Sequence, residues 1–115
     1  MIKHFGAHGA PQGGLNLASV SCGQRELLSI YLKTFETVVK EAKPWAVMSS
    51  YNSWNNEPNS SSHYLMTELL RDRWDFQGYV YSDWGAIGML NYFHKTAQNS
   101  AEAAIQALTA GLDAE

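Results

Sequence analysis

Apolar residues recur at helical intervals over residues 23–43 of the chain. The recurring positions are Leu27, Leu28, Tyr31, Phe35, Val38, Val39 and Ala42. Ser21 and Gln24 have the spacing of a capping box at the start of this segment, and Pro44 follows its end. The pattern predicts one long amphipathic helix over this range.

Other apolar runs are short and lack the helical period, which favours strands. Residues 1–5 are typical of the end of one strand, and residues 45–52 of a second strand that is buried in a parallel sheet. Gly78 begins a third strand that leads into Asp83, and residues 112–113 are typical of the start of a fourth. The glycine-rich residues 6–17 and the polar residues 53–62 are predicted to be loops.

Further helices are predicted between these strands. A serine near residue 62 can cap a helix over residues 63–74, with Leu65, Met66, Leu69 and Leu70 on its buried face. A short helix is expected around residues 86–93. Asn99 and Glu102 have the spacing of a second capping box, and Gly111 is a suitable C-terminal stop for the helix that follows.

Strand and helix therefore alternate, which is the order of βα units and predicts the α/β class. Two architectures use this order, the closed (β/α)₈ TIM barrel and the open doubly wound sheet. No glycine-rich phosphate turn of the GxGxxG type opens a helix here. A whole barrel needs roughly 200 to 250 residues, so we expect this chain of 115 residues to be a partial barrel that is cut inside its first and last strands.

Composition narrows the possible partners. The formal net charge is -3 and the cations are scattered, so we expect no nucleic-acid partner. No apolar run approaches the ~20 residues that span a bilayer, and the N-terminus has no signal-peptide pattern, so we expect no membrane segment. The one cysteine, Cys22, has no second thiol with which to form a disulfide or hold a metal.

Polar side chains end each of the first three predicted strands: Lys3 with His4, Tyr51 with Asn52, and Asp83 with Trp84. The carboxyl ends of parallel strands meet at one edge, so we expect these side chains to converge there. Charged and amide groups bind hydroxyls, and an indole ring packs against the C–H bonds of a sugar. The pattern therefore favours a glycoside as the ligand.

Five stretches, in family order, resemble the N-terminal barrel of glycoside hydrolase family 3. They are KHFG from Lys3, RELLSIYLKTFETVVKEA from Arg25, VMSSYN from Val47, LLRDRWDFQGYVYSDWGA from Leu69 and AGLDAE from Ala110. The resemblance implies about four βα units from the C-terminal half of that barrel, in an enzyme of the β-glucosidase or β-xylosidase type. It also implies a β-glycoside or oligosaccharide substrate, no cofactor, and a periplasmic or secreted location.

The same resemblance implies roles for six residues. Asp83 is the expected nucleophile of a retaining glycosidase, and the expected substrate-binding residues are Lys3, His4, Met48, Tyr51 and Trp84. Lys3 and His4 would bind sugar hydroxyls, and Met48 and Trp84 would form pocket walls. Tyr51 would orient the nucleophile, and a hydrogen bond from Tyr51 together with the charge of Lys3 would favour its ionised form.

A retaining glycosidase also needs a second carboxyl group, about 5 to 5.5 Å from the nucleophile. Glu57, Asp113 and Glu115 lie near the relevant predicted loops, but family members of this type usually take the acid/base from a following domain. We therefore expect it outside this chain, together with the missing half of the barrel, and expect the chain alone to be inactive. The loop after His4 lacks the Asp-Ser-His sequence of the N-acetylglucosaminidase branch.

The family usually has glycine where this chain has Asn56 and Asp75, and both replacements tolerate turns. Simpler interpretations of the polar residues remain. Asp83 could cap a helix, and the spacing of His4 and His8 could suit zinc, although no HExxH pattern is present.

Aromatic residues outside the predicted site are expected to pack. Trp45 is assigned to packing, and Tyr79 and Tyr81 to contacts with the helices. Two other functions compete with the glycosidase: a non-catalytic carbohydrate-binding or scaffold piece, and a metal-dependent barrel hydrolase.

Overall fold

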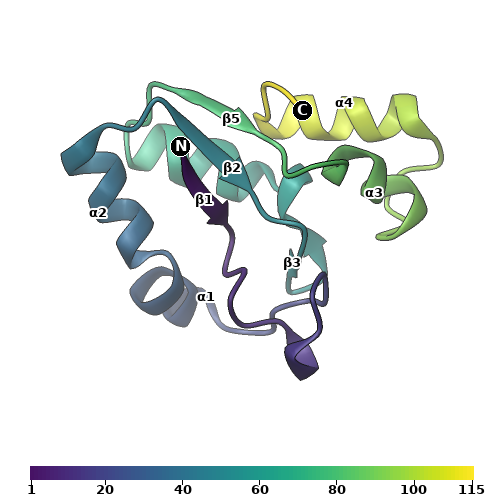
Figure 1. Ribbon diagram of the computed structural model, residues 1–115, viewed down its shortest axis with the longest axis horizontal. Coiled ribbons are helices and arrows are strands. Elements are labelled where there is room, and N and C mark those ends of the chain that lie inside the picture. Colours follow the sequence, from purple (N-terminus) through teal and green to yellow (C-terminus); the bar gives the residue numbers. More distant parts are fainter.

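A three-stranded parallel sheet forms the centre of the computed structural model, which describes residues 1–115. Its strands lie in sequence order: β1 (Ile2–Phe5), β2 (Ala46–Ser49) and β5 (Tyr79–Tyr81). Ala114 forms a parallel bridge with Tyr81, so the fourth predicted strand begins to pair at this edge. The α/β class and the parallel sheet are confirmed (Figure 1).

Neighbouring strands pair Val47 with Val80 and Met48 with Tyr81. Both valines are fully buried, whereas Tyr79 is 47% exposed. The expected contact of Tyr79 with the helices was therefore wrong. Successive side chains of a strand point to opposite faces of the sheet. In a strand of three residues, the sequence does not show which face tyrosine occupies and which face valine occupies.

The helix predicted over residues 23–43 is divided into three segments: α1 (Gln24–Glu26), the π-helical η2 (Leu27–Tyr31) and α2 (Lys33–Ala42). The predicted capping box is absent, because Gly23 is the N-cap residue and makes no side-chain cap. The hydroxyl of Ser21 instead accepts a hydrogen bond from Gln12 Nε2 at 2.8 Å. Lys43 ends α2 in the left-handed conformation.

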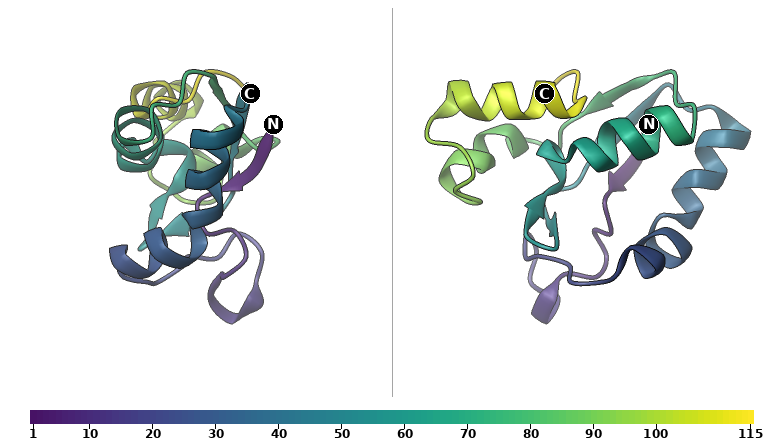
Figure 2. Two further views of the ribbon diagram at one scale, coloured as in Figure 1. Left: turned by 90° about the vertical axis from the view of Figure 1, so that its left-hand side faces the viewer. Right: turned by 180° about the vertical axis from the view of Figure 1, so that it is seen from behind.

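The next predicted helix is η4 (Tyr64–Arg73), whose hydrogen bonding is π-helical. Its buried residues are the four that were predicted: Leu65, Met66, Leu69 and Leu70. The hydroxyl of Ser62 accepts a hydrogen bond from Leu65 N at 3.4 Å at the start of this helix. Seen from behind, η4 crosses the back of the sheet (Figure 2).

Two helices follow β5, namely α3 (Ala86–Tyr92) and α4 (Ser100–Ala110). The predicted cap at Asn99 is confirmed, because its side chain accepts a hydrogen bond from Glu102 N at 2.9 Å. Gly111 ends α4 with φ of 108°, a backbone conformation that favours glycine. No helix in the structure has the length and apolar character needed to cross a membrane.

Short elements occupy the two predicted loops. The first loop contains η1 (Gln12–Gly14). The second contains a hairpin of β3 (Ser53–Trp54) and β4 (Glu57–Pro58), which is followed by η3 (Asn59–Ser61). The hairpin turns at Asn55 and Asn56, which both have positive φ angles. Asp75 also has a positive φ, of 59°. Asn56 and Asp75 therefore adopt the turn conformations that glycine would otherwise provide.

The hydrophobic core connects β1 to the helices. The ring of Phe5 lies 5.4 Å from that of Phe35 in α2 and 5.8 Å from that of Trp74 after η4, both edge to face. Phe5 is fully buried, so this cluster fixes the end of β1 against both helices. The residues that follow β1 are therefore held in place relative to β2 and β5.

Candidate active site at the ends of the parallel strands

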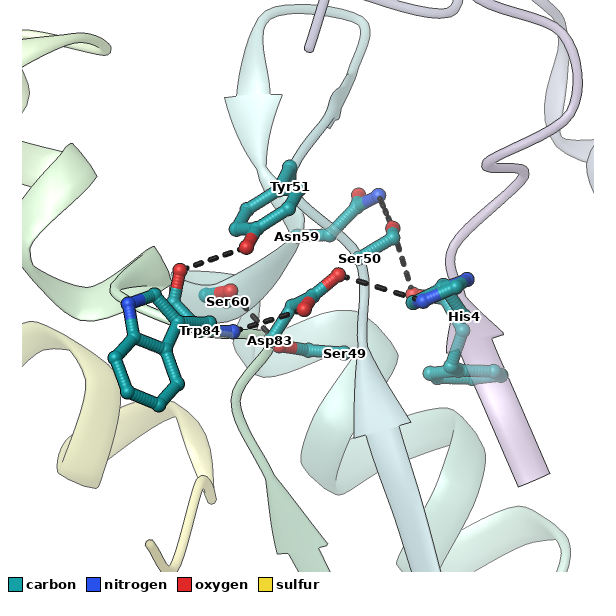
Figure 3. A network of polar contacts seen from close by, with 9 residues as sticks. His4, Ser49, Ser50, Tyr51, Asn59, Ser60, Asp83 and Trp84 are labelled. Carbon is teal, nitrogen blue, oxygen red and sulfur yellow. Dashed lines mark hydrogen bonds and ion pairs between the residues drawn. The ribbon is translucent and has the colours of Figure 1, made fainter. Parts of the chain in front are cut away.

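Asp83 lies just after β5, and one of its carboxylate oxygens accepts a hydrogen bond from Trp84 N at 2.8 Å. Its other oxygen, Oδ2, lies 3.4 Å from His4 Nε2, and the two side chains are only 17% and 24% exposed. Figure 3 shows His4 and Asp83 approaching each other from β1 and β5. The structure thus brings together two of the three predicted strand ends.

His4 is the side chain that forms an ion-pair contact with Asp83 when its imidazole is protonated. Burial lowers the pKa of His4, and the charge of Asp83 opposes this only in part; the neighbouring His8 and Lys3 lower the pKa further. The rings of His4 and His8 are 4.5 Å apart. His4 is therefore neutral near pH 7, and with its proton on Nε2 it can donate that proton to a carboxylate or bind a hydroxyl.

Tyr51 reaches the Asp83 loop from the end of β2. Its hydroxyl donates to the Trp84 carbonyl at 2.7 Å. Burial raises the pKa of Tyr51, and the nearby charge of Asp83 raises it further. A hydroxyl has a single proton, and the 2.7 Å distance shows that Tyr51 donates this proton to Trp84 O. Tyr51 therefore contacts the residue next to Asp83. Its raised pKa keeps the hydroxyl protonated.

A cavity of about 470 Å³ opens beside Asp83. Its lining residues are Met48, Tyr81, Ser82, Asp83, Trp84, Gly85 and Glu115. The Trp84 side chain is 90% exposed, which leaves the indole free to contact a ligand. Lys3, by contrast, is exposed and forms no ion pair in the structure.

The three carboxylates considered as acid/base are in different environments. Glu57 is exposed in β4. Asp113 accepts hydrogen bonds from Arg71 and, at 2.7 Å, from Val80 N. Only Glu115 lines the Asp83 cavity, and its Oε2 accepts hydrogen bonds from Ser82 Oγ and Ile87 N, both at 2.9 Å.

A buried polar layer lies beneath the site and was not predicted. Asn52, expected at the sheet edge, is 1% exposed, and its Nδ2 donates to Gly6 O at 2.9 Å. Asn59 Nδ2 donates to the same carbonyl at 2.7 Å and to Ser50 Oγ at 2.8 Å, and Ser50 Oγ donates to Phe5 O. These contacts fix the backbone just after His4; in the sequence, the same serines and asparagines are equally typical of a solvated loop.

No group of three or more histidine, cysteine, aspartate or glutamate side chains is arranged to hold a metal ion. A second cavity, of about 490 Å³, lies between the end of α2 and the residues that precede β2 and β5. It contains none of the predicted site residues. Trp45, which was expected to pack, lines this cavity and is 86% exposed.

The whole chain, residues 1–115, matches the glycosyl hydrolase family 3 N-terminal domain. A putative beta-xylosidase of Formosa agariphila is 39% identical over 113 residues, which are 98% of this chain and 15% of that protein. A periplasmic beta-glucosidase of Salmonella typhimurium is 38% identical over 112 residues, which are 97% of this chain and 14% of that protein.

Among solved structures, a β-glucosidase from Erythrobacter marinus superposes with a TM-score of 0.95 at 35% sequence identity. The superposition covers 98% of this chain and 15% of that one. The chain therefore spans about 15% of the length of these relatives.

Proposed function

This chain belongs to glycosyl hydrolase family 3, and from that premise we propose that it carries the nucleophile of a retaining β-glycosidase. The substrate is a β-glycoside or oligosaccharide, from which the enzyme removes a terminal glucosyl or xylosyl residue at the non-reducing end. The observation that carries the proposal is the position of Asp83: it lies at the carboxyl end of a parallel strand, beside His4, in a cavity walled by Met48 and Trp84.

In the proposed reaction, Asp83 attacks the anomeric carbon and the glycosidic bond breaks, which leaves a covalent glycosyl-enzyme. The second carboxyl group gives its proton to the departing oxygen and then takes a proton from the water that releases the sugar. The N–H of Trp84 holds one oxygen of Asp83 in place. His4 and Lys3 bind hydroxyls of the sugar, and Trp84 presents its indole to the C–H face of the ring.

We assign the acid/base to polypeptide outside residues 1–115. Of the candidate carboxylates within the chain, only Glu115 shares a cavity with Asp83, and its Oε2 already accepts two hydrogen bonds from the loop around Asp83. This contact gives Glu115 a structural role in holding that loop. On this assignment residues 1–115 alone have no glycosidase activity.

The order of the strands fits a barrel. Strands β1, β2 and β5 follow one another in the sheet, and Ala114 extends the same order. Neighbours in a barrel follow the sequence, and no switch point, at which a doubly wound sheet reverses its order, lies among these strands. We therefore assign residues 1–115 to the N-terminal catalytic barrel domain, as about four βα units of its C-terminal half.

We also place the protein in the periplasm or outside the cell, as for the relative named a periplasmic beta-glucosidase. Cell fractionation with an antibody to the polypeptide tests this placement. Recovery of the protein in the cytoplasmic fraction alone would contradict it.

Substitution of Asp83 in the polypeptide that contains this chain tests the function. With aryl β-glucosides and β-xylosides as substrates, Asp83→Asn should lower kcat by about 10³-fold or more, the scale expected when a reacting group is removed. Asp72→Asn, the same change at an exposed residue of η4, is the matched control and should leave kcat unchanged. Unchanged turnover in the Asp83 variant would favour a non-catalytic carbohydrate-binding or scaffold role for this chain. Loss of turnover when a chelator removes metal ions would favour a metal-dependent hydrolase.

A further inference from the structure

We infer that His94 is a positioning residue for Tyr51, and through Tyr51 for the loop that carries Asp83. The catalytic part of this inference rests on the proposed function. His94 follows α3 and is partly buried, and its Nε2 lies 2.9 Å from the carbonyl oxygen of Tyr51. It forms no hydrogen bond or ion pair with Asp83.

Tyr51 is held at two points by one segment of the chain. Its hydroxyl donates to the carbonyl of Trp84, and its own carbonyl accepts from His94. The intervening residues form α3 (Ala86–Tyr92), so the two anchoring points are joined by a short helix. Rotation of Tyr51 away from Asp83 therefore requires at least one of these bonds to break.

His94 itself is fixed at the end of α3. Its backbone N–H donates to Met89 O at 2.8 Å, and its ring contacts that of Phe93 edge to face, with 5.0 Å between the centroids. Burial lowers the pKa of His94, so the imidazole is neutral near pH 7. A carbonyl can only accept, so the proton of the neutral ring lies on Nε2 and is donated to Tyr51.

This arrangement links the Asp83 loop to the end of β2. The loop begins at the end of β5, continues into α3, and returns through His94 to Tyr51. Removal of the imidazole leaves the carbonyl of Tyr51 without this donor and frees the residue to move. The hydroxyl of Tyr51 then leaves its position at the Trp84 carbonyl, beside Asp83.

The test compares His94→Ala with His94→Gln, whose side-chain amide can still donate a hydrogen bond. Titration of Tyr51, followed by NMR of ring-labelled tyrosine and assigned with Tyr51→Phe, is the primary measurement. It needs no enzymatic activity. The pKa of Tyr51 is raised by burial and by Asp83, so it should fall towards 10 in His94→Ala and stay near the wild-type value in His94→Gln.

Kinetics give the second measurement, on the polypeptide that contains this chain. His94→Ala should lower kcat about 10-fold, which is within the range of interaction energies measured between residues in contact. It should change KM less than about twofold. His94→Gln should restore most of the loss. In the Tyr51→Phe background, His94→Ala should have little further effect, because the hydroxyl whose position His94 maintains is already absent.

An unchanged Tyr51 pKa in His94→Ala overturns the inference, whatever the enzymatic activity. Equal and independent losses of kcat from the two single variants also overturn it, because His94 would then act without Tyr51. If His94→Ala fails to fold, a displaced Tyr51 pKa in the folded His94→Gln variant overturns it. The proposed function fails separately, if wild-type protein shows no turnover or if Asp83→Asn retains it.

Discussion

Asp83 depends on residues that are distant from it in the sequence. His4 must lie within reach of its carboxylate, and the backbone that follows His4 is fixed at Gly6. The carbonyl of Gly6 accepts hydrogen bonds from two buried amides, those of Asn52 and Asn59. The position of His4 therefore rests on contacts made by buried side chains.

Gly6 allows a sharp test of this dependence. Its φ is 122°, and a Cβ atom added there would lie 2.2 Å from Asn59 Nδ2. Gly6→Ala should therefore cost roughly 2 kcal/mol or more of unfolding free energy, and should lower kcat/KM about 10²-fold because His4 is displaced. Urea unfolding and steady-state kinetics of the polypeptide that contains this chain measure the two effects.

Gly9→Ala is the matched control. Nothing lies within 4 Å of a Cβ atom at Gly9, and its φ is outside the left-handed region. This variant should match the wild type in both measurements. Equal behaviour of the Gly6 and Gly9 variants would show that the buried amides do not position His4.

Helices show which features the sequence can predict and which it cannot. The buried face of η4 was predicted residue by residue, because the apolar period survives the change to π-type hydrogen bonding. For the same reason, the break at η2 within the helix predicted over residues 23–43 could not be predicted. Hydrophobic periodicity reports the face that a helix buries and is insensitive to its hydrogen-bonding pattern.

Of the two predicted capping boxes, only the one at Asn99 forms a helix cap, so substitutions at Asn99 and Ser21 should differ in their effect on stability. Asn99 caps α4, whereas the hydroxyl of Ser21 only accepts from Gln12. Asn99→Ala should therefore cost about 1 kcal/mol of unfolding free energy. Ser21→Ala should change it by less than about 0.5 kcal/mol, the usual range for a surface substitution. Denaturant unfolding measures both, and an equal loss in the two variants would contradict the assignment of the caps.

Residues of the candidate site could be predicted where they end a strand. Asp83, His4 and Tyr51 were identified in this way, and the structure places them around one loop. His94 could not be identified, because its contact with the backbone of Tyr51 depends on how α3 folds back. The sequence around it contains no motif that distinguishes a positioning histidine from a surface one.

At the scale of the whole molecule, the sheet unites the ends of β1, β2 and β5 at one edge, and the candidate site lies there (Figure 3). The wall of the Asp83 cavity is completed by Glu115, beside the bridge that Ala114 forms. The larger cavity near Trp45 precedes the strands and holds none of the site residues. The choice of the candidate site therefore rests on its position relative to the strand ends and not on cavity size.

Two partly buried histidines, His4 and His94, predict how the stability of the fold depends on pH. Burial lowers the folded-state pKa of His4 and His94 below the ordinary value of 6.5. As the pH falls through 6.5, the unfolded chain takes up protons that the folded protein does not, so the free energy of unfolding decreases until the lowered folded-state values are passed. Urea unfolding at several pH values between 8 and 5 should show this decrease.

His94→Gln removes one of the two groups and should make the decrease shallower. Its matched control is His63→Gln, at an exposed histidine that precedes η4. The slope should change more in the His94 variant than in this control. Parallel slopes in the wild type and the His94 variant would contradict burial of a neutral imidazole at this position.

Covalent trapping of the nucleophile tests the central claim most directly. A 2-deoxy-2-fluoro-β-glycoside with a dinitrophenolate leaving group forms the glycosyl-enzyme but releases it slowly, because fluorine destabilises both positively charged transition states and the good leaving group compensates only in the first step. After proteolysis of the inactivated polypeptide, mass spectrometry should find the fluoroglycosyl group on the peptide that contains Asp83, attached to that carboxylate. A label on Glu115, Asp113 or any other residue, or turnover that continues without a label, would contradict the assignment of Asp83 as the nucleophile.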